Sequence, residues 1–300
     1  MCMHVHQEIA AAAFKINERY KSMDHLSLVF FTVFAQASIG LFIVLGVLHL
    51  SVTPKNSVLS KGFLFVWPLF GIALLCSLTH LGQPLRAFNV LSGVTHGSPL
   101  SIEIISSIAF GSFGFIFTVL EWFKLGSDLF RKVLLFISMI VGCWLLMAIS
   151  NVYTLDGVMA WANALTPIQF FSTALILGVT GTIAIINLMP KTTKGAPAIR
   201  IVTLSLFGVG LLISMAVFAA FLLHIGKEGL IPQQLHSYIA VVKVMFTLIG
   251  AALCVVYVIK PEKHNSMVKT VSMCVGVLLL ITSELSGRVM FYDMYYITGM

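Results

Sequence analysis

The sequence predicts an all-α integral membrane protein with eight transmembrane helices, arranged as two four-helix bundles. Of the 300 residues, 59% are hydrophobic and only 10% are charged, which excludes an ordinary soluble domain. The apolar segments run unbroken for about twenty residues, the length that a helix needs to cross the hydrocarbon core. A transmembrane β-barrel would instead alternate lipid-facing and lumen-facing residues along shorter strands, so a helical bundle remains.

The apolar windows follow one another with short connectors that contain helix-breaking residues, such as Thr53-Pro54, Met189-Pro190 and Lys260-Pro261. No connector is long enough to hold a soluble domain, so residues 23–300 are expected to form one membrane domain. The eight windows are 28–50, 63–81, 102–123, 133–150, 165–189, 201–225, 238–259 and 270–287.

Residues 1–22 form an N-terminal tail before the first window. Its apolar stretch, residues 10–14, is too short for the core of a signal peptide and is followed by charged residues, so we expect no cleavage. Met23 stands directly before the first span and is an alternative start of translation.

The positive charges predict the orientation, because cytoplasmic loops carry the excess of Lys and Arg. Most of these residues lie in connectors that follow odd-numbered spans, and both termini are therefore expected on the outer, periplasmic side. The residues in these connectors are Lys55, Lys61, Lys124, Arg131, Lys132, Lys191, Lys194, Arg200, Lys260, Lys263 and Lys269.

Polar residues gather near the predicted outer face. His80 ends the second span, Glu103 begins the third, and the connector between them carries Arg86 and Asn89. An ionisable residue at such a position is a functional hypothesis by default. The alternatives remain open, because a backbone carbonyl could satisfy His80 and Glu103 could stabilise the N-terminus of its helix through the macrodipole.

Four further residues are candidates for a secondary role at the same site. Gln36 and Glu284 lie inside predicted spans, Arg288 directly follows the last span, and Asn89 lies in the connector after the second span. Glu284 and Arg288 are four residues apart, a spacing typical of a structural ion pair. Lys243 is expected to extend its ammonium group outward to the membrane surface. Gln36 and Asn187 could each hydrogen-bond a neighbouring helix. At the inner face, we expect His49 and Glu121 to be interfacial.

This set of residue types suits a hydroquinone. Each hydroxyl of a hydroquinone needs a hydrogen-bond acceptor, and its oxidation releases two protons that an imidazole or a carboxylate can accept. The five cysteines include no C-x-x-C pair, and the histidines form no facing pairs at mid-membrane depth. We therefore expect no haem, iron–sulfur cluster or metal on this chain, and we expect a partner subunit to take up the electrons.

Several stretches resemble one known family. They are residues 31–36, residues 77–89, Glu103-Ile104, and residues 284–288 with Phe291-Tyr292. On these residues the chain resembles the membrane anchor subunits of the anaerobic dimethyl sulfoxide reductase family, within the polysulfide-reductase-like membrane subunits. The resemblance extends over nearly all of residues 23–300. It departs at residues 24–27, where the family has a His-Glu-Trp-like sequence.

The resemblance implies a multi-pass subunit of the bacterial inner membrane that serves anaerobic respiration. Such a subunit anchors a molybdopterin catalytic subunit and a four-cluster iron–sulfur subunit, and it oxidises menaquinol and passes the electrons to the iron–sulfur subunit. The family's quinol-associated histidine and glutamate fall on His80 and Glu103 in this sequence, with Arg86 in the same loop. The terminal acceptor would be dimethyl sulfoxide or a related compound.

Two other functions remain open from the sequence. The first is a purely structural anchor, in which His80 and Glu103 only dock a partner subunit. The second is a secondary transporter, because residues 34–38 and 170–174 share a loose pattern. Transporters, however, place their ligands near the midplane on broken helices, whereas the charged residues here lie near the span ends.

Overall fold

All regular elements in the described part of the chain are helices. The structure is a computed structural model, and it describes residues 2–51, 57–80, 93, 96–154, 158, 160–187, 196–227, 234–259 and 266–298. Its elements are α1 (Cys2–Ser51), α2 (Ser57–Gly62), the 3-10 helix η1 (Phe63–Phe65), α3 (Val66–His80), α4 (Pro99–Phe123), α5 (Asp128–Tyr153), α6 (Leu165–Asn187), α7 (Ala196–Lys227), α8 (Gln234–Ile259) and α9 (Ser266–Thr298).

Eight spans in the described residues are long and apolar enough to cross a membrane, which confirms the prediction of a multi-pass helical membrane protein. The second span, Val58–Thr79, is assembled from α2, η1 and α3. The last span is longer than predicted and covers Met267–Tyr295. The predicted window ended at residue 287, directly before Arg288. In the structure the Arg288 side chain is buried and the helix continues past it.

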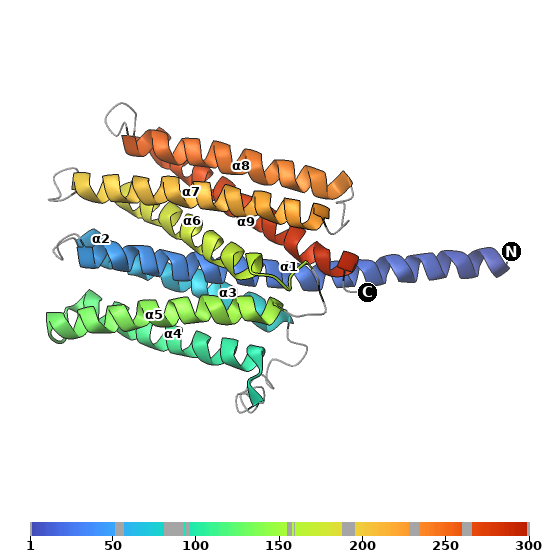
Figure 1. The fold of residues 1–300 in the computed structure, drawn as a ribbon, viewed down its shortest axis with the longest axis horizontal. Coiled ribbons are helices and arrows are strands. Elements are labelled where there is room, and N and C mark those ends of the chain that lie inside the picture. The colour runs from blue at the N-terminus through green and yellow to red at the C-terminus, as the bar shows by residue number, and fades with distance from the viewer. Residues whose placement is uncertain are drawn as a thin grey trace.

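The helices run roughly along the long axis of the molecule, with α1 in the middle and its N-terminal part projecting beyond the bundle (Figure 1). Helices α4 and α5 lie on one side of α1, and α7 and α8 lie on the other. The C-terminal end of α9 lies at the end of the bundle from which the N-terminal part of α1 projects, and we call this the termini end. The grouping into two bundles and the membrane side of the termini stay predictions.

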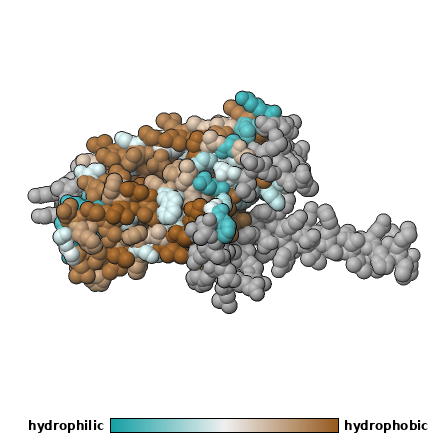
Figure 2. Space-filling view, turned by 60° about the horizontal axis from the view of Figure 1, so that its bottom comes forward, coloured by the Kyte–Doolittle hydropathy of each residue, from teal (hydrophilic) through white to brown (hydrophobic). Residues whose placement is uncertain are grey.

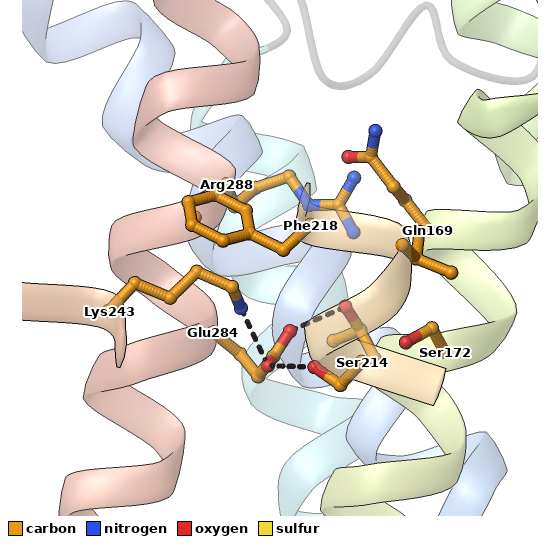
Figure 3. Close-up of a pocket in the computed structure, with 10 residues that line it drawn as sticks. Gln169, Ser172, Ser214, Phe218, Lys243, Glu284 and Arg288 are labelled. Carbon is orange, nitrogen blue, oxygen red and sulfur yellow. Dashed lines mark hydrogen bonds and ion pairs between the residues drawn. The ribbon is translucent and has the colours of Figure 1, made fainter. Parts of the chain in front are cut away.

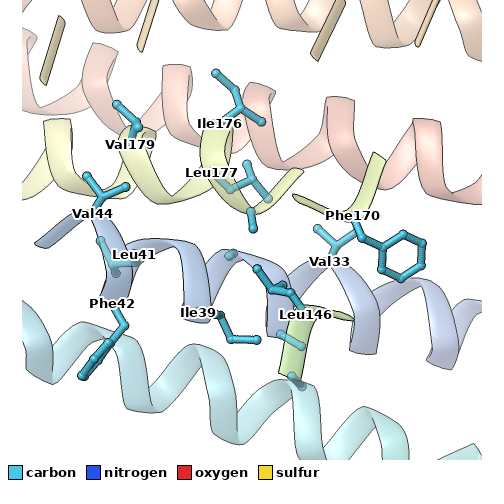
Figure 4. Close-up of a cluster of buried hydrophobic side chains, with 14 of the residues drawn as sticks. Val33, Ile39, Leu41, Phe42, Val44, Leu146, Phe170, Ile176, Leu177 and Val179 are labelled. Carbon is cyan, nitrogen blue, oxygen red and sulfur yellow. The ribbon is translucent and has the colours of Figure 1, made fainter. Parts of the chain in front are cut away.

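Helices α1 and α6 pack closely at the centre of the bundle. A Cβ atom added at Gly40 of α1 would lie 1.8 Å from the carbonyl oxygen of Ala174, and one added at Gly178 would lie 2.3 Å from the backbone of Gly40. Around this crossing, apolar side chains such as Ile39 and Leu177 fill the core (Figure 4). Because lipid tails are as apolar as leucine, the close approach of small residues is what holds such helices together.

The outward faces of the helices are apolar. Leu212 on α7 is 74% exposed and Leu129 on α5 is 72% exposed. Figure 2 shows a mostly hydrophobic surface along the length of the bundle, with hydrophilic residues gathered towards its ends. This inversion of the usual soluble pattern is what a lipid environment requires.

Candidate functional site

A groove of about 800 Å³ opens on the surface between α3 and α4. Its walls are apolar and aromatic, with Trp67 and Phe70 from α3 and Phe115 from α4, and Phe31 of α1 closes its back. This volume is within the range of pockets that take drug-sized molecules. Since the groove lies between two membrane spans, a lipid-soluble molecule could enter it sideways from the bilayer.

Glu103 is the ionisable residue that lines the α3–α4 groove. Its helix begins at Pro99 after Ser98, so Glu103 stands in the second turn of α4 near the termini end, and only 6% of it is exposed. No hydrogen bond or ion pair between described residues involves its carboxyl group. A buried carboxyl group without such a partner is costly, so this group is available to a hydroxyl of a bound molecule.

The other two predicted quinol residues are placed only in part. His80 is the last residue of α3, at the termini end, and its side chain lies outside the described part of the structure. Ser77 and Leu78, one turn earlier on α3, line the same groove as Glu103, so the structure brings the end of α3 to this site. Arg86 and Asn89 lie outside the described residues.

A second polar cluster is buried between α6, α7, α8 and α9 (Figure 3). Lys243 Nζ lies 2.8 Å from Glu284 Oε1, and both side chains are almost fully buried. Thr173 Oγ1 donates to Glu284 Oε2 at 2.7 Å, and Ser214 Oγ donates to Glu284 Oε1 at 3.2 Å. The expectation that Lys243 reaches the membrane surface is therefore wrong, because a buried carboxylate on α9 binds its ammonium group.

Arg288 has a different partner from the one that its spacing predicted. Its Nη2 donates to the side-chain oxygen of Gln36 on α1 at 2.9 Å, and its guanidinium lies 3.8 Å from the centre of the Phe170 ring. Glu284 pairs with Lys243, so the predicted ion pair between Glu284 and Arg288 is wrong. The expectation that Gln36 bonds a neighbouring helix is confirmed.

The buried cluster contains donors whose partners are not among the described side chains. Arg288 Nη1, Gln169 Nε2 and Gln36 Nε2 are buried without a hydrogen-bond partner in the described part of the chain. The cavity next to Arg288 and Gln169 has a volume of about 20 Å³, which is enough for one water molecule.

Aromatic side chains pack next to the buried cluster, and the sequence analysis named only Phe291 and Tyr292 among them. Tyr153 on α5 and Tyr292 on α9 pack edge to face with ring centroids 5.3 Å apart, and the Tyr153 ring also lies 5.6 Å from that of Phe170, which the Arg288 guanidinium faces. Trp161 Nε1 donates to the carbonyl oxygen of Phe291 at 2.8 Å, and the two rings stack with centroids 5.1 Å apart. In the sequence, Tyr153 and Trp161 cannot be told from ordinary aromatic residues at a membrane interface. Phe291 and Tyr292 could be selected only because they lie in the stretches that resemble the family.

The opposite end of the bundle holds a separate ion-pair network. Glu121 Oε2 accepts a hydrogen bond from Arg131 Nε at 2.9 Å, and Glu121 Oε1 bonds Lys124 and the hydroxyl of Ser60. His49 Nε2 lies 3.7 Å from the same carboxylate. His49 and Glu121 thus lie at the span ends, as expected, but they are buried and joined to each other. This network ties the ends of α1, α2, α4 and α5 together.

The polar residue Asn187 bonds mainly within its own helix. Its Nδ2 donates to the carbonyl oxygen of Ile183 at 3.0 Å, and it lies 4.0 Å from the sulfur of Met273 on α9. Among the described residues, its bond to a neighbouring helix is this weak contact with the Met273 sulfur.

Comparisons with known proteins give one consistent answer. A protein-family model described as DMSO reductase anchor subunit (DmsC) matches residues 20–294. The sequence is 28% identical to anaerobic dimethyl sulfoxide reductase chain YnfH of Escherichia coli K12, over 91% of this protein and 95% of that one. It is 30% identical to another anaerobic dimethyl sulfoxide reductase chain from the same organism, over 91% and 96% of the two lengths. An anaerobic dimethyl sulfoxide reductase chain from Haemophilus influenzae is 29% identical, over 92% and 96%.

Proposed function

The chain belongs to the DMSO reductase anchor subunit family, and from this premise we propose that it binds and oxidises menaquinol within an anaerobic dimethyl sulfoxide reductase-type complex. In this proposal the protein anchors a molybdopterin catalytic subunit and a four-cluster iron–sulfur subunit to the bacterial inner membrane. The observation that carries the proposal is Glu103, a buried carboxyl group in an apolar groove between two membrane spans.

The α3–α4 groove suits the shape and chemistry of a quinol. The isoprenoid tail of a menaquinol is as apolar as lipid, and the aromatic walls at Trp67, Phe70 and Phe115 offer apolar surfaces to it. Phe115 lies twelve residues along α4 from Glu103, about 18 Å at a rise of about 1.5 Å per residue, so the head group would lie at the other end of the groove, where the Glu103 carboxyl group provides a hydrogen-bond acceptor. Ligand sites are usually mostly apolar pockets that contain a few polar groups.

Oxidation of the quinol releases two electrons and two protons. In the proposed reaction, the Glu103 carboxylate accepts the proton of one hydroxyl and the His80 imidazole accepts the proton of the other. The two electrons pass one at a time to an iron–sulfur cluster of the partner subunit, and the product quinone leaves through the lipid-facing opening. Arg86, in the loop that follows His80, supplies a fixed positive charge next to the head group.

The secondary residues divide into two groups. Asn89 shares the connector with Arg86 and remains a proposed contact to the head group. Gln36, Glu284 and Arg288 belong to the buried cluster behind the aromatic residues, and their described hydrogen bonds join them to protein groups. We assign these three a positioning role, in which they fix α1 and α9 behind the site.

The orientation of the proposal follows the distribution of charge. With the Lys-rich connectors on the inner side, the termini end and the α3–α4 groove lie near the periplasmic face. A short path for the electrons then requires the iron–sulfur subunit to dock on that face. Family membership favours this proposal over a secondary transporter.

Quinol-dependent turnover in membranes tests the proposal. His80→Ala and Glu103→Gln are expected to lose turnover with a menaquinol analogue, while the catalytic and iron–sulfur subunits stay bound to the membrane. Asp128→Asn is the matched control, because it makes the same acid-to-amide change on an exposed residue at the opposite end. Release of the partner subunits by the two site variants would favour a purely structural anchor, and full turnover in both would contradict the site.

A further inference from the structure

The small cavity inside the buried cluster carries more positive than negative charge. Among the described residues that line it, Lys243 and Arg288 are cations and Glu284 is the one acid. Lys243 Nζ lies 2.8 Å from Glu284 Oε1, so these two charges neutralise each other. The Arg288 guanidinium stays protonated in proteins, and no described carboxylate pairs with it. The cavity therefore has one positive charge in excess.

Arg288 is buried more completely than a cation without an ionic partner normally is. Only 4% of the residue is exposed. Its described partners are neutral, because Nη2 donates to the side-chain oxygen of Gln36 and the guanidinium faces the Phe170 ring at 3.8 Å. Nη1 has no hydrogen-bond partner in the described part of the chain. A buried charged donor of this kind needs a further acceptor, and preferably one with a negative charge.

The groups without a partner at the cavity are hydrogen-bond donors. The Arg288 guanidinium extends towards the Gln169 side chain, and both residues line the cavity (Figure 3). Gln169 Nε2 is likewise buried without a partner among the described groups. The Glu284 oxygens already accept hydrogen bonds from Lys243 and Thr173. A water molecule would need acceptors for its own two hydrogens, whereas an anion only accepts.

We propose that this cavity binds one chloride ion, which accepts hydrogen bonds from Arg288 and Gln169 and neutralises the cluster. The volume of about 20 Å³ is little more than the space that one water molecule needs, so the cavity admits a monatomic anion and excludes sulfate and phosphate. Chloride is the abundant monatomic anion in the aqueous phases beside a membrane. The hydroxyl of Ser172, which also lines the cavity, is a third donor within the site.

The proposed chloride site lies close to one end of a membrane span. Helix α6 begins at Leu165, and Gln169 stands four residues along it, about 6 Å at a rise of about 1.5 Å per residue. Gln169 is half-buried, so an ion reaches Arg288 past this side chain. Bound chloride would join α6 to α9, and the bond between Arg288 and Gln36 extends the connection to α1. This role does not depend on quinol oxidation.

The chloride dependence of thermal unfolding tests the proposal on the purified full-length protein. The apparent Tm is measured in chloride buffer and in gluconate buffer of the same ionic strength. We expect Tm to rise by roughly 5–10 °C and to level off at chloride concentrations about 100-fold above Kd, because the ion binds only the folded state. The same Tm in both buffers would overturn the proposal.

Two variants test which residues hold the ion. Gln169→Leu removes one donor and is expected to raise the half-saturating chloride concentration about tenfold, the effect of one hydrogen bond to an ion. Arg288→Gln is expected to abolish the chloride response. Asn187→Leu is the matched control, because it makes the same kind of amide-to-alkyl change on a half-buried residue at the other end of α6. Equal responses in Gln169→Leu and Asn187→Leu would contradict the site.

Anomalous diffraction identifies the ion directly. Bromide replaces chloride at halide sites and scatters anomalously, so crystals of the assembled complex would be soaked in bromide. We expect one anomalous peak between Arg288 and Gln169. A cavity without an anomalous peak would hold an ordered water only, and this result would overturn the proposal.

Discussion

The ion pair between Lys243 and Glu284 should contribute strongly to the stability of the C-terminal helices. The Lys243→Met substitution removes the ammonium group and keeps an unbranched stem that can still pack against Gly287 and Phe218. The Glu284 carboxylate would then keep only the hydroxyl donors among its described partners, in a site where it is 6% exposed.

The magnitude follows from the burial of both partners. Removing one partner of a buried ion pair costs roughly 3–5 kcal/mol, because the remaining charge is left uncompensated. At about 2–4 °C per kcal/mol for a chain of more than 150 residues, the apparent Tm should fall by roughly 6–20 °C. Thermal unfolding of the detergent-purified protein, followed by the fluorescence of a thiol-reactive dye, measures this change.

A double-mutant cycle identifies the cause. In the Lys243→Met background, Glu284→Gln removes the uncompensated charge and is expected to restore much of the lost stability. The reasoning would be refuted by a double variant that is less stable than Lys243→Met by the full cost of Glu284→Gln alone. Such additivity would mean that the two charges do not interact.

Two other predictions concern helix packing. Gly40→Ala should destabilise the protein by about 3 kcal/mol, the upper range for overpacking, because its Cβ would overlap the backbone of Ala174. Gly208→Ala, with open space around it, should be neutral or stabilising. Equal Tm values for the two variants would contradict this packing. Trp161→Phe should cost about 1 kcal/mol by losing the hydrogen bond to the Phe291 carbonyl, and an unchanged Tm would show that this bond contributes nothing.

The number and order of the spans could be predicted from the sequence, because a long apolar segment in lipid must form a helix to satisfy the hydrogen bonds of its backbone N–H and C=O groups. Boundaries were less predictable where charges are buried. The last span was predicted to end at residue 287, since the sequence alone does not show that the next residue, Arg288, is buried and donates a hydrogen bond to Gln36 from another helix. The central crossing at Gly40 was also missed, because small residues in a span have no partner until the fold is known.

For the candidate site, the sequence selected Glu103 on its depth and charge, and the structure adds the apolar groove around it. The spacing of residues in the sequence could not predict side-chain pairs between different helices. The spacing of Glu284 and Arg288 suggested a pair on one helix, whereas three-dimensional packing gives each a partner from a different helix. Local rules fail at such positions because competition between partners is decided by the tertiary arrangement.

The central claim is that Glu103 belongs to a quinol pocket, and inhibitor binding tests it most directly. A menaquinol-analogue inhibitor of the hydroxyquinoline N-oxide type would be titrated by fluorescence into membranes that contain the assembled complex. We expect one inhibitor per complex for the wild-type protein and for Asp128→Asn, and loss of binding in Glu103→Gln with all subunits still assembled. Equal affinity in Glu103→Gln and the wild-type protein would contradict the claim and would place the quinol site away from the α3–α4 groove.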